Sequence, residues 1–247
     1  MLITFAIMMT AKEIIGYMES LQDEKQRREL MRFFKTGPGE YGEGDEFLGL
    51  KVPQTREIVK LTGRDLPIEE VPELLMSGWH EVRLCGLLIL VARFEKLSKK
   101  RMENDESAIN SRDEIMRMYL QHAERANNWD LVDLSAPKIL GNWLLLPTRL
   151  DDKREIMDGL AASDCLWRQR MSMVSTWKTT QQGDPSWCLR YAEWHLHHPH
   201  DLMHKAVGWM LREVGKRCSM DLLRQFLERH AQEMPRTALR YAIEQMS

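Results

Sequence analysis

Apolar residues recur at helical spacing along almost the whole chain. Over residues 11–35 the pattern has a break near Gln22–Lys25, and its apolar positions are Ile14, Ile15, Met18, Leu21, Leu30 and Phe33/Phe34. Such a period predicts amphipathic helices. It predicts further helices at about 53–62, 68–77, 80–97, 111–125, 128–146, 152–161, 164–180, 185–196, 202–217, 219–231 and 235–245. No segment alternates apolar and polar residues as a strand does, so we predict an all-α protein.

A weak internal repeat bears on how these short helices pack, in a bundle or in a solenoid. The repeat joins SGWHEVRLCGLLIL at 77–90, SDCLWRQRMSMVSTW at 163–177 and HDLMHKAVGWMLREVG at 200–215. Each segment places a basic residue (Arg83, Arg170 or Lys205) before a run of small and apolar residues. Paired-helix repeats have periods of about 34 to 47 residues, close to the Arg170–Lys205 interval. We therefore favour a right-handed α-solenoid of HEAT-like antiparallel helix pairs, whose concave face suits a long ligand.

The beginning of the chain looks different from the rest. MLITFAIMM is apolar but lacks a basic region and is too short to span a bilayer. Thr10 and Glu13 have the spacing of a capping box, which predicts that the first helix starts at about residue 11. We therefore expect an N-terminal tail at residues 1–10 and a single HEAT-like domain at residues 11–247. We expect no association with a membrane.

The cysteines and charges bound the function only weakly. Four cysteines lie far apart with no C-x-x-C pair, which argues against a zinc site or a disulfide framework and suits the cytoplasm. The chain has 35 basic and 37 acidic residues, so its global charge indicates no polyanionic partner. Residues 161–247, however, hold 12 Lys/Arg and 9 Asp/Glu, a net charge of +3. This asymmetry allows a basic face in the C-terminal part.

Two conspicuous segments have ordinary explanations. The loop GPGEYGEGDEFLG at 37–49 has five glycines but lacks the spacing of a phosphate-binding loop, and its acidic residues would repel a nucleotide. We interpret it as a shaped connection. The cluster HLHHPH at 195–200 suggests a metal site, but no cysteine or H-E-x-x-H pattern accompanies it. A helix end that runs into a proline-stopped loop explains this cluster better.

Two tryptophans have neighbours that suggest chemistry. Trp209 lies in a segment that also carries Lys205, Arg212, Lys216 and Arg217, so it either packs in the core or faces a polyanion. Trp129 precedes Asp133 by four residues, and such residues are neighbours on one face of a helix. This pair is either a surface acid beside a core indole or the floor of a site.

Four segments, taken in order, resemble the AlkD-like family of DNA alkylation repair glycosylases. They are YGEGDEFLGLKVPQTREI, NNWDLVDLSAPKILG, LWRQR and KAVGWMLREVGK, and the resemblance runs from about Arg32 to the C-terminal helices. It implies an all-helical HEAT-like solenoid that holds duplex DNA in a positively charged concave channel. It also implies a glycosylase of base excision repair that hydrolyses the N-glycosidic bond of N3- and N7-alkylated purines, without a metal or organic cofactor.

The resemblance assigns roles to particular residues. It implies that Asp133 is the catalytic carboxylate, that Trp129 and Trp209 are the cleft tryptophans, and that Arg170 contacts DNA near the lesion. Lys205 and Arg212, on the same segment as Trp209, are the further DNA-binding candidates. Phe33 matches an aromatic wall of the lesion site that carries a hydroxyl in some members of the family. The phenylalanine here lacks that hydroxyl.

The chemistry of the reaction is consistent with a single carboxylate. Alkylation at N3 or N7 makes the purine a cationic leaving group, so no paired general acid is needed, unlike in ordinary glycoside hydrolysis. One carboxylate can stabilise an oxocarbenium-like sugar and orient the water. Aromatic faces attract nearby cationic character. We expect Asp130, one helical step away, to be an acid at the helix end or on its outer face.

Other questions stay open at this point. Most glycosylases rotate the target nucleotide out of the stack, whereas the resemblance implies a lesion that stays largely stacked. The alternative function is a non-catalytic helical-repeat module that binds DNA or proteins. The joint presence of Trp129, Asp133, Arg170 and Trp209 favours the enzyme. We expect a monomer that binds double-stranded DNA.

Overall fold

The computed structural model describes residues 10–63, 66–102, 104–147 and 150–246. Within these ranges the secondary structure is helical, and extended pairing is limited to one isolated bridge between Glu46 and Trp79. The helices are α1 (Ala11–Ser20), α2 (Glu24–Phe33), α3 (Val52–Thr62), η1 (Ile68–Glu70), α4 (Val71–Leu75), α5 (His80–Leu97), η2 (Lys100–Met102), α6 (Glu106–Gln121), η3 (Ala123–Arg125), α7 (Trp129–Leu144), α8 (Leu150–Ala161), α9 (Leu166–Val174), α10 (Thr176–Gln181), α11 (Ser186–Trp194), α12 (Asp201–Arg217), α13 (Met220–His230) and α14 (Arg236–Ile243). The all-α prediction is confirmed.

The chain divides into two compact units, residues 1–131 and 132–247. Helix α7 begins in the first unit and continues into the second. Of the expected N-terminal tail, residues 1–9 lie outside the described residues, and Thr10 caps α1 through the predicted capping box with Glu13. The solenoid, its concave face and the single domain stay predictions.

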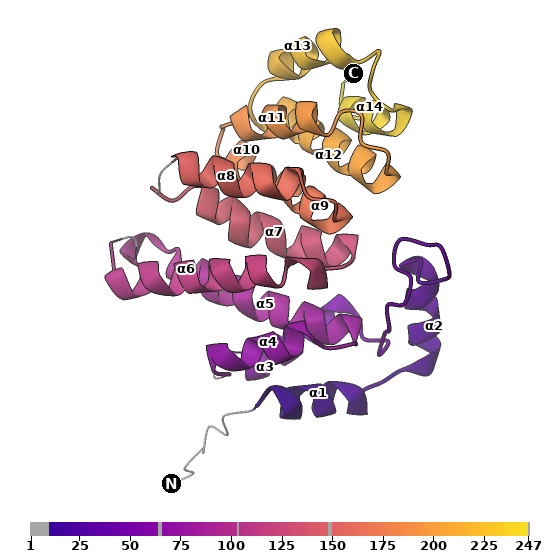
Figure 1. Cartoon of the computed structure of the whole chain (residues 1–247), viewed down its shortest axis with the longest axis vertical. Helices are drawn as coiled ribbons and strands as arrows, with labels where there is room; N and C mark the ends of the chain where they lie inside the picture. The colour runs from indigo at the N-terminus through magenta and orange to yellow at the C-terminus, as the bar shows by residue number, and fades with distance from the viewer. Residues whose placement is uncertain (1–9, 64–65, 103, 148–149, 247) are drawn as a thin grey trace. The chain divides into compact units, whose positions relative to one another are not determined.

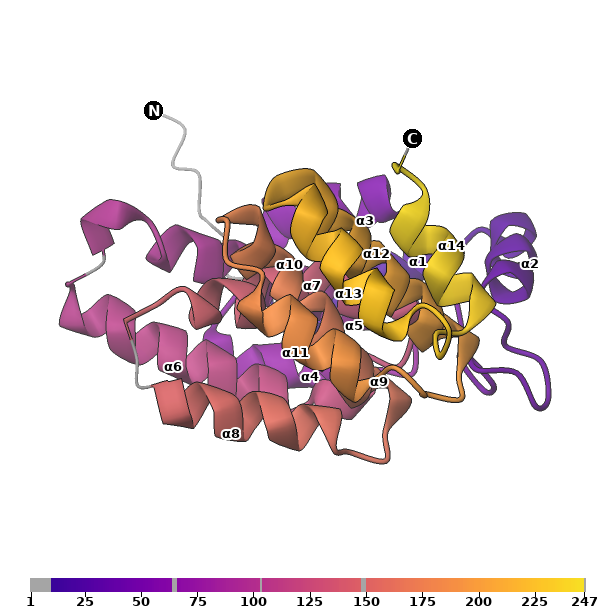
Figure 2. The same cartoon turned by 90° about the horizontal axis from the view of Figure 1, so that it is seen from above.

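Helix α5 is the centre of the first unit (Figure 1). Every residue from His80 to Val91 is buried, and the run 84–91 is apolar on all sides, as expected for a helix surrounded by protein. Helices α3, α4 and α6 pack against it, and α1 packs against α4. Helix α2 and the loop that follows it lie to one side of α3–α6 in both Figure 1 and Figure 2.

The Gly-rich loop after α2 is a shaped connection, as predicted. Gly39, Gly44 and Gly49 have positive φ values of 76°, 77° and 91°, which L side chains rarely adopt. A Cβ on Gly49 would lie 2.2 Å from the carbonyl oxygen of Asp23. The carboxylates of Glu40 and Glu43 are already engaged, because they accept hydrogen bonds from the backbone N–H groups of Gly37 and Gly39. The loop folds on itself and returns the chain to the core at Asp45.

In the second unit, one predicted helix is interrupted. The pattern over 164–180 predicted a continuous helix, but the structure has α9 and α10, separated at Ser175. The Ser175 hydroxyl donates to the carbonyl of Met171 and the Thr176 hydroxyl donates to that of Met173. Hydroxyls that bond back to the preceding turn bend helices. The prediction of a continuous helix was therefore wrong. The predicted break near Gln22–Lys25 and the predicted helix at about 80–97 are confirmed.

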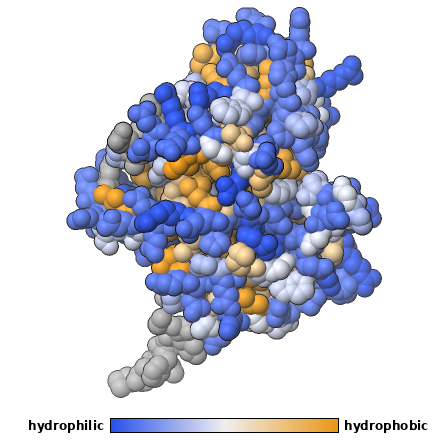
Figure 3. Space-filling model, in the orientation of Figure 1, coloured by the Kyte–Doolittle hydropathy of each residue, from blue (hydrophilic) through white to orange (hydrophobic). Residues whose placement is uncertain are grey.

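Helix α12 organises the second unit. It contacts α9, α10, α11, α13 and α14, and α14 runs beside it in Figures 1 and 2. Gly208 allows this approach, because a Cβ there would lie 2.3 Å from the carbonyl oxygen of Ala238 and 2.5 Å from Cβ of Tyr241. Hydrophilic residues cover most of the face shown in Figure 3. None of the helices in the described part of the chain is long and apolar enough to cross a membrane.

We predict that Gly208→Ala destabilises the protein, because the added methyl group meets backbone atoms of α14 that cannot easily move aside. Overpacking of this kind costs about 1–3 kcal/mol of the free energy of unfolding. Gly159→Ala is the matched control, since Gly159 lies in α8 and a Cβ added there would have nothing within 4 Å. We expect this variant to be neutral or stabilised by up to about 1 kcal/mol. Urea titrations of both variants decide, and equal unfolding midpoints would contradict the proposed close approach.

Candidate active site

The first turn of α7 carries the residues that the sequence singled out. The side-chain oxygen of Asn128 accepts a hydrogen bond from the backbone N–H of Trp129 at 2.9 Å, where the helix begins. Trp129 is half-buried and Asp130 is buried. Asp133 follows one turn later, and its side chain is 18% exposed. The helix itself therefore places Trp129 and Asp133 on one face.

Aromatic rings surround Trp129 in the first unit. The Trp129 ring lies 5.4 Å from Phe34 and 6.0 Å from Phe33, measured between ring centroids. Phe34 stacks on Phe47 at 5.2 Å, and Phe47 stacks on the imidazole of His80 at 4.3 Å. Phe34 and Phe47 are buried, but Phe33 is 62% exposed. Phe33 therefore stands beside Trp129 as an accessible aromatic edge, a position compatible with the predicted wall.

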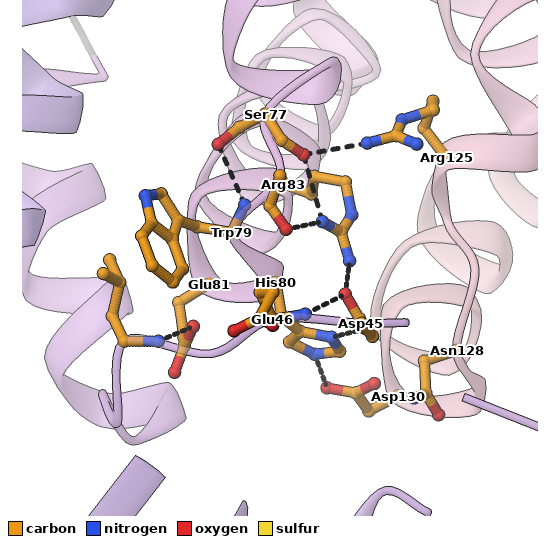
Figure 4. A network of polar contacts seen from close by, with 12 residues as sticks. Asp45, Glu46, Ser77, Trp79, His80, Glu81, Arg83, Arg125, Asn128 and Asp130 are labelled. Atoms are coloured by element: carbon orange, nitrogen blue, oxygen red, sulfur yellow. Dashed lines mark hydrogen bonds and ion pairs between the residues drawn. The ribbon is translucent and has the colours of Figure 1, made fainter. Parts of the chain in front are cut away.

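Beneath these rings lies a buried chain of charged groups (Figure 4). His80 bridges two carboxylates: Nδ1 lies 2.8 Å from Asp45 Oδ2, and Nε2 lies 3.0 Å from Asp130 Oδ2. Asp45 is also ion-paired with Arg83. Nη1 of Arg83 donates to the carbonyl oxygens of Ser77 at 3.0 Å and Gly78 at 2.8 Å. This network of charged groups joins the Gly-rich loop, the start of α5 and the start of α7.

The charges in this network follow from its geometry. Burial alone would lower the pKa of His80, but the carboxylates of Asp130 and Asp45 outweigh it and raise that pKa to about 9. Burial would raise the pKa of Asp45, whereas His80 and Arg83 lower it below its ordinary value. His80 is therefore an imidazolium at neutral pH. Both of its ring nitrogens donate, one to each carboxylate.

The prediction for Asp130 was wrong. We expected an acid at the helix end or on the outer face, but the residue is 6% exposed and faces His80. The reason is a partner fifty positions earlier in the chain, which allows this carboxylate to be buried by compensating its charge. Asp130 is a structural element that fixes the first turn of α7.

A second carboxylate fixes the loop beside Phe47. Glu81 is buried, and it accepts hydrogen bonds from the backbone N–H groups of Leu48, Gly49 and Leu50 at 2.8–3.0 Å. Charge-assisted bonds to consecutive amides are among the stronger hydrogen bonds. They hold the loop end against α5 and thus position Phe47 under Phe34.

In the second unit, Asp133 is held by a buried arginine. Arg170 Nε donates to Asp133 Oδ1 and Nη2 donates to Oδ2, both at 2.8 Å. Nη1 donates to the carbonyl oxygen of Leu202 at 2.5 Å. Arg170 is 4% exposed. This geometry supports a role in orienting Asp133 and does not favour the expected contact with DNA, which stays a prediction.

Pro137 lies one turn after Asp133 within α7. Proline has no N–H, so it cannot donate the helical hydrogen bond to the carbonyl of the residue four positions earlier. That residue is Asp133. The helix interior is therefore weakened at the turn that carries the candidate carboxylate. This proline was a signal for the site that the sequence analysis did not use.

Trp209 lies on a polar stripe of α12. Lys205, Trp209, Arg212 and Lys216 are spaced at three- and four-residue intervals, which aligns them on one face. Trp209 is half-buried. Lys205 Nζ lies 2.7 Å from Asp201, and Arg212 is ion-paired with Glu244. The stripe combines an indole with cations whose carboxylate partners are themselves exposed.

The histidine cluster does not converge on a metal position. His195 Nε2 lies 2.8 Å from Ser172 Oγ, and burial, followed by the charge of His198, lowers its pKa to about 4. His198 bonds to Gln169, and His200 Nδ1 accepts from the N–H of Leu202. In the part of the chain that the structure describes, no three His, Cys, Asp or Glu side chains gather to bind a metal. Helix α11 ends at Trp194, which confirms the predicted helix end.

Sequence reasoning missed His80 and Asp45. Their signal was present: His80, Glu81 and Arg83 are three charged or polar residues that directly precede the apolar run 84–91 of the same helix. Such residues can be buried only with partners of opposite charge. The partner Asp45 lies within a loop whose acidic residues looked alike in the sequence.

We predict that the bridged His80 makes stability depend on pH. Its folded pKa of about 9 exceeds the ordinary value of 6.5, so its contribution is fully present below pH 6.5 and is lost as the pH rises towards 9. The loss is on the order of 3 kcal/mol. Urea titrations between pH 6 and 9 measure it. His80→Gln should be less stable at pH 6 and should lose most of this slope.

His197→Gln serves as the control, because that ring is 70% exposed at the surface. It should keep the slope of the unaltered protein. A free energy of unfolding that stays level from pH 6 to 9 in the unaltered protein would contradict a charged His80.

Comparisons with known proteins agree with this architecture. The family model for the DNA alkylation repair enzyme matches residues 14–246. A solved structure described as a predicted DNA alkylation repair enzyme from Enterococcus faecalis is similar in fold, with a TM-score of 0.68 at 14% identity over 92% of this chain and 97% of that one. No curated protein matches the chain. Because the family model covers nearly the whole chain, the protein belongs to the DNA alkylation repair enzyme family and has a role in DNA repair.

Proposed function

We propose that the protein is a monofunctional DNA glycosylase that hydrolyses the N-glycosidic bond of cationic N3- and N7-alkylated purines in duplex DNA. This reaction begins base excision repair. The observation that carries the proposal is Asp133, a partly exposed carboxylate clamped by a buried arginine one helical turn after Trp129. The resemblance of its surrounding segment to the AlkD-like glycosylases supports the same assignment.

The reaction asks little of the protein beyond electrostatics. When the bond between C1′ and the purine nitrogen breaks, its electron pair neutralises the cationic base, which leaves without being protonated. The sugar becomes oxocarbenium-like, and water adds to C1′ and loses a proton. Asp133 would stabilise the developing cation and orient the water. An acid opposite Asp133 is not required, in contrast to the two-carboxylate scheme of glycoside hydrolases.

The clamp by Arg170 prepares Asp133 for this role. Each hydrogen bond from the guanidinium uses one of about two lone-pair sites on a carboxylate oxygen, and the Asp133 side chain stays 18% exposed. A bidentate arginine also fixes the plane of the carboxylate, which a lysine cannot do. Preorganisation of this kind means that little reorganisation is needed when charge develops.

The tryptophans would contribute through their faces. The negative quadrupole of an indole attracts cationic character by about 0.5–2 kcal/mol. We assign this role to Trp129 and Trp209, both of which are half-buried and so present part of their surface to solvent. Phe33 extends the aromatic surface beside Trp129 without contributing a hydroxyl.

Double-stranded DNA would bind to Lys205 and Arg212, whose present ion-pair partners a phosphate can replace. Lys205 and Arg212 are paired with exposed carboxylates, and exposed pairs contribute only about 0–1 kcal/mol. A phosphate can therefore replace Asp201 or Glu244 with little loss of stability. We further propose that the protein is a monomer. We also propose a cytoplasmic location, which suits four cysteines that are free thiols.

We predict that Asp133→Asn slows base release by about 10²–10³-fold, because the amide keeps the shape of the side chain but removes its charge. Single-turnover release of 7-methylguanine from a defined duplex, in the presence of EDTA, measures the rate. Affinity for duplex DNA should hold or rise, since a negative charge facing a polyanion is gone. Circular dichroism and urea titration confirm equal folding.

Asp158→Asn is the matched control. Asp158 is also bound by an arginine, with Arg190 Nη2 at 2.7 Å, and it accepts from the Tyr191 hydroxyl at 2.7 Å. This variant should release the base at the rate of the unaltered protein. Asp130→Asn does not suit as a control, because Asp130 compensates His80. Equal rates for Asp133→Asn and the unaltered enzyme would remove Asp133 from the chemistry, and an inactive unaltered protein would support the non-catalytic scaffold.

An experiment on Arg170 can distinguish two roles for this residue, orienting Asp133 or contacting a DNA phosphate. If it orients Asp133, Arg170→Lys should reduce the saturating rate of base release by about tenfold or more, since small misplacements of catalytic groups are costly. The dependence of duplex affinity on salt should stay unchanged. If Arg170 neutralises a phosphate, the slope of log affinity against log salt should fall by about one unit instead. The second outcome would restore the DNA contact predicted from the sequence.

A further inference from the structure

A groove in the first unit gathers positive charge at the opposite end of α5 from His80. It lies between α3 and α5, has a volume of about 580 Å³, and is lined by the basic residues Lys60, Arg93, Lys96 and Lys99. Among the described residues, the rest of its lining is apolar or glycine, without a carboxylate. We call it the basic groove. Its composition is unexpected, because residues 1–131 hold 19 Lys/Arg against 23 Asp/Glu, a net charge of −4.

The cations of the basic groove are only weakly compensated. Arg93 is half-buried, and its guanidinium donates to the carbonyl oxygens of Gly63 and Leu66, so backbone rather than carboxylate holds it. Burial lowers the pKa of Arg93, which the more distant charge of Glu69 only partly offsets. Lys60 is paired with Glu57, but both side chains are more than 60% exposed. Within the described chain, Lys96 and Lys99 have no ion pair.

Positive charge continues past the groove. Residues 93–101 contain five basic residues and one acidic residue, because Lys100 and Arg101 in η2 follow directly after Lys99. Cations near the end of α5 also complement the helix dipole, an effect of about 0.3–1 kcal/mol for each. That structural benefit requires only cations near the last turn of α5. It does not account for Lys60, which comes from α3.

We infer that the basic groove binds the phosphodiester backbone of duplex DNA at a distance from the lesion. This inference rests on the proposed function for the presence of the duplex. Exposed lysines act as mobile point charges, which suits contacts that position DNA without reading its sequence. None of the described residues that line the groove is aromatic, so they offer no platform for unstacked bases of a single strand.

An acidic protein segment fits the observations less well. Such a segment needs large apolar side chains to anchor it as well as charge, and no large apolar residue in the described lining is exposed. Of its apolar residues, Ile89 is buried and Val59 is half-buried. Ala92 is exposed, but its side chain is small. A backbone of phosphates needs no such anchor.

Within the first unit, the length of α5 separates the groove from His80, which lies in the buried network next to the Trp129 end of the candidate site. His80 and Lys96 both belong to α5 and are separated by sixteen residues, or about 24 Å along the helix axis. This length corresponds to about seven base pairs at roughly 3.4 Å per pair. A duplex that extends only a few pairs from the lesion would not reach the basic groove.

The test compares Lys96→Gln/Lys99→Gln with Lys12→Gln/Lys25→Gln. The control pair loses the same charge at exposed lysines of α1 and α2. Fluorescence anisotropy on an undamaged duplex of about 24 base pairs should show a several-fold weaker affinity for the groove variant alone. The slope of log affinity against log salt should fall by about 0.9 for each lost phosphate contact. Urea titration should find both variants equally folded.

Duplex length provides the second measurement. With 7-methylguanine at the centre of a long duplex, the groove variant should need several-fold more protein for half-maximal single-turnover release, at an unchanged saturating rate. With a duplex of about 12 base pairs this difference should vanish, because the ends fall short of the groove. A difference that persists on the short duplex would overturn the distant contact.

The remaining outcomes separate the groove from the proposed function. If the unaltered protein releases the base and the groove variant binds duplex like the control, the groove inference is overturned and the glycosylase proposal stands. The groove variant could instead bind duplex DNA normally but lose binding of poly-L-glutamate. That result would overturn the groove inference in favour of an acidic protein partner. If the unaltered protein binds no duplex at all, the groove inference and the DNA partner fail together.

Discussion

A charged imidazole between two buried carboxylates holds the first unit together. His80 is buried as a cation because both carboxylates compensate its charge. Asp130 depends on His80 in turn, whereas Asp45 is compensated by His80 and Arg83 together. Because the three residues come from the Gly-rich loop, α5 and α7, their mutual compensation fixes where those segments meet. The aromatic rings then stack on that base, from His80 through Phe47 and Phe34 to Trp129. The position of the indole is thus a consequence of buried electrostatics.

The same principle recurs at Asp133 with a different result. Asp130 is buried and both His80 contacts are internal, whereas Asp133 keeps part of its carboxylate accessible while a buried arginine holds it from behind. Two aspartates on neighbouring turns of one helix therefore differ in environment: one closes a buried network and the other stays partly exposed. Removing a buried partner of either leaves an uncompensated charge, which typically costs about 3–5 kcal/mol. For this reason the informative substitutions are of two kinds. Asp133→Asn keeps the size of the side chain and removes its charge, whereas Arg170→Lys keeps the charge and removes the bidentate hydrogen bonds.

Much of the fold follows from local pattern. The period of apolar residues predicted a helix at about 80–97, and α5 spans these residues. The same rule failed over 164–180, where hydroxyl groups of Ser175 and Thr176 compete for backbone carbonyls without disturbing the apolar period. It also placed a helix start at residue 111, although α6 begins five residues earlier, where Asp105 caps it with a bond to the N–H of Ala108. Side-chain bonds to the backbone decide such boundaries, and periodicity does not register them.

The site shows the same division between local and distant causes. The spacing of Trp129 and Asp133 is a property of one helix, so it could be inferred from one short segment of sequence. The roles of Asp130 and Arg170 could not, because each depends on a partner brought from another segment, His80 for the first and Asp133 for the second. A sequence motif tells which residues belong together but not which of them face solvent. An arginine in such a motif can meet a phosphate or hold the carboxylate that meets the sugar, and only its burial and its hydrogen bonds separate the two.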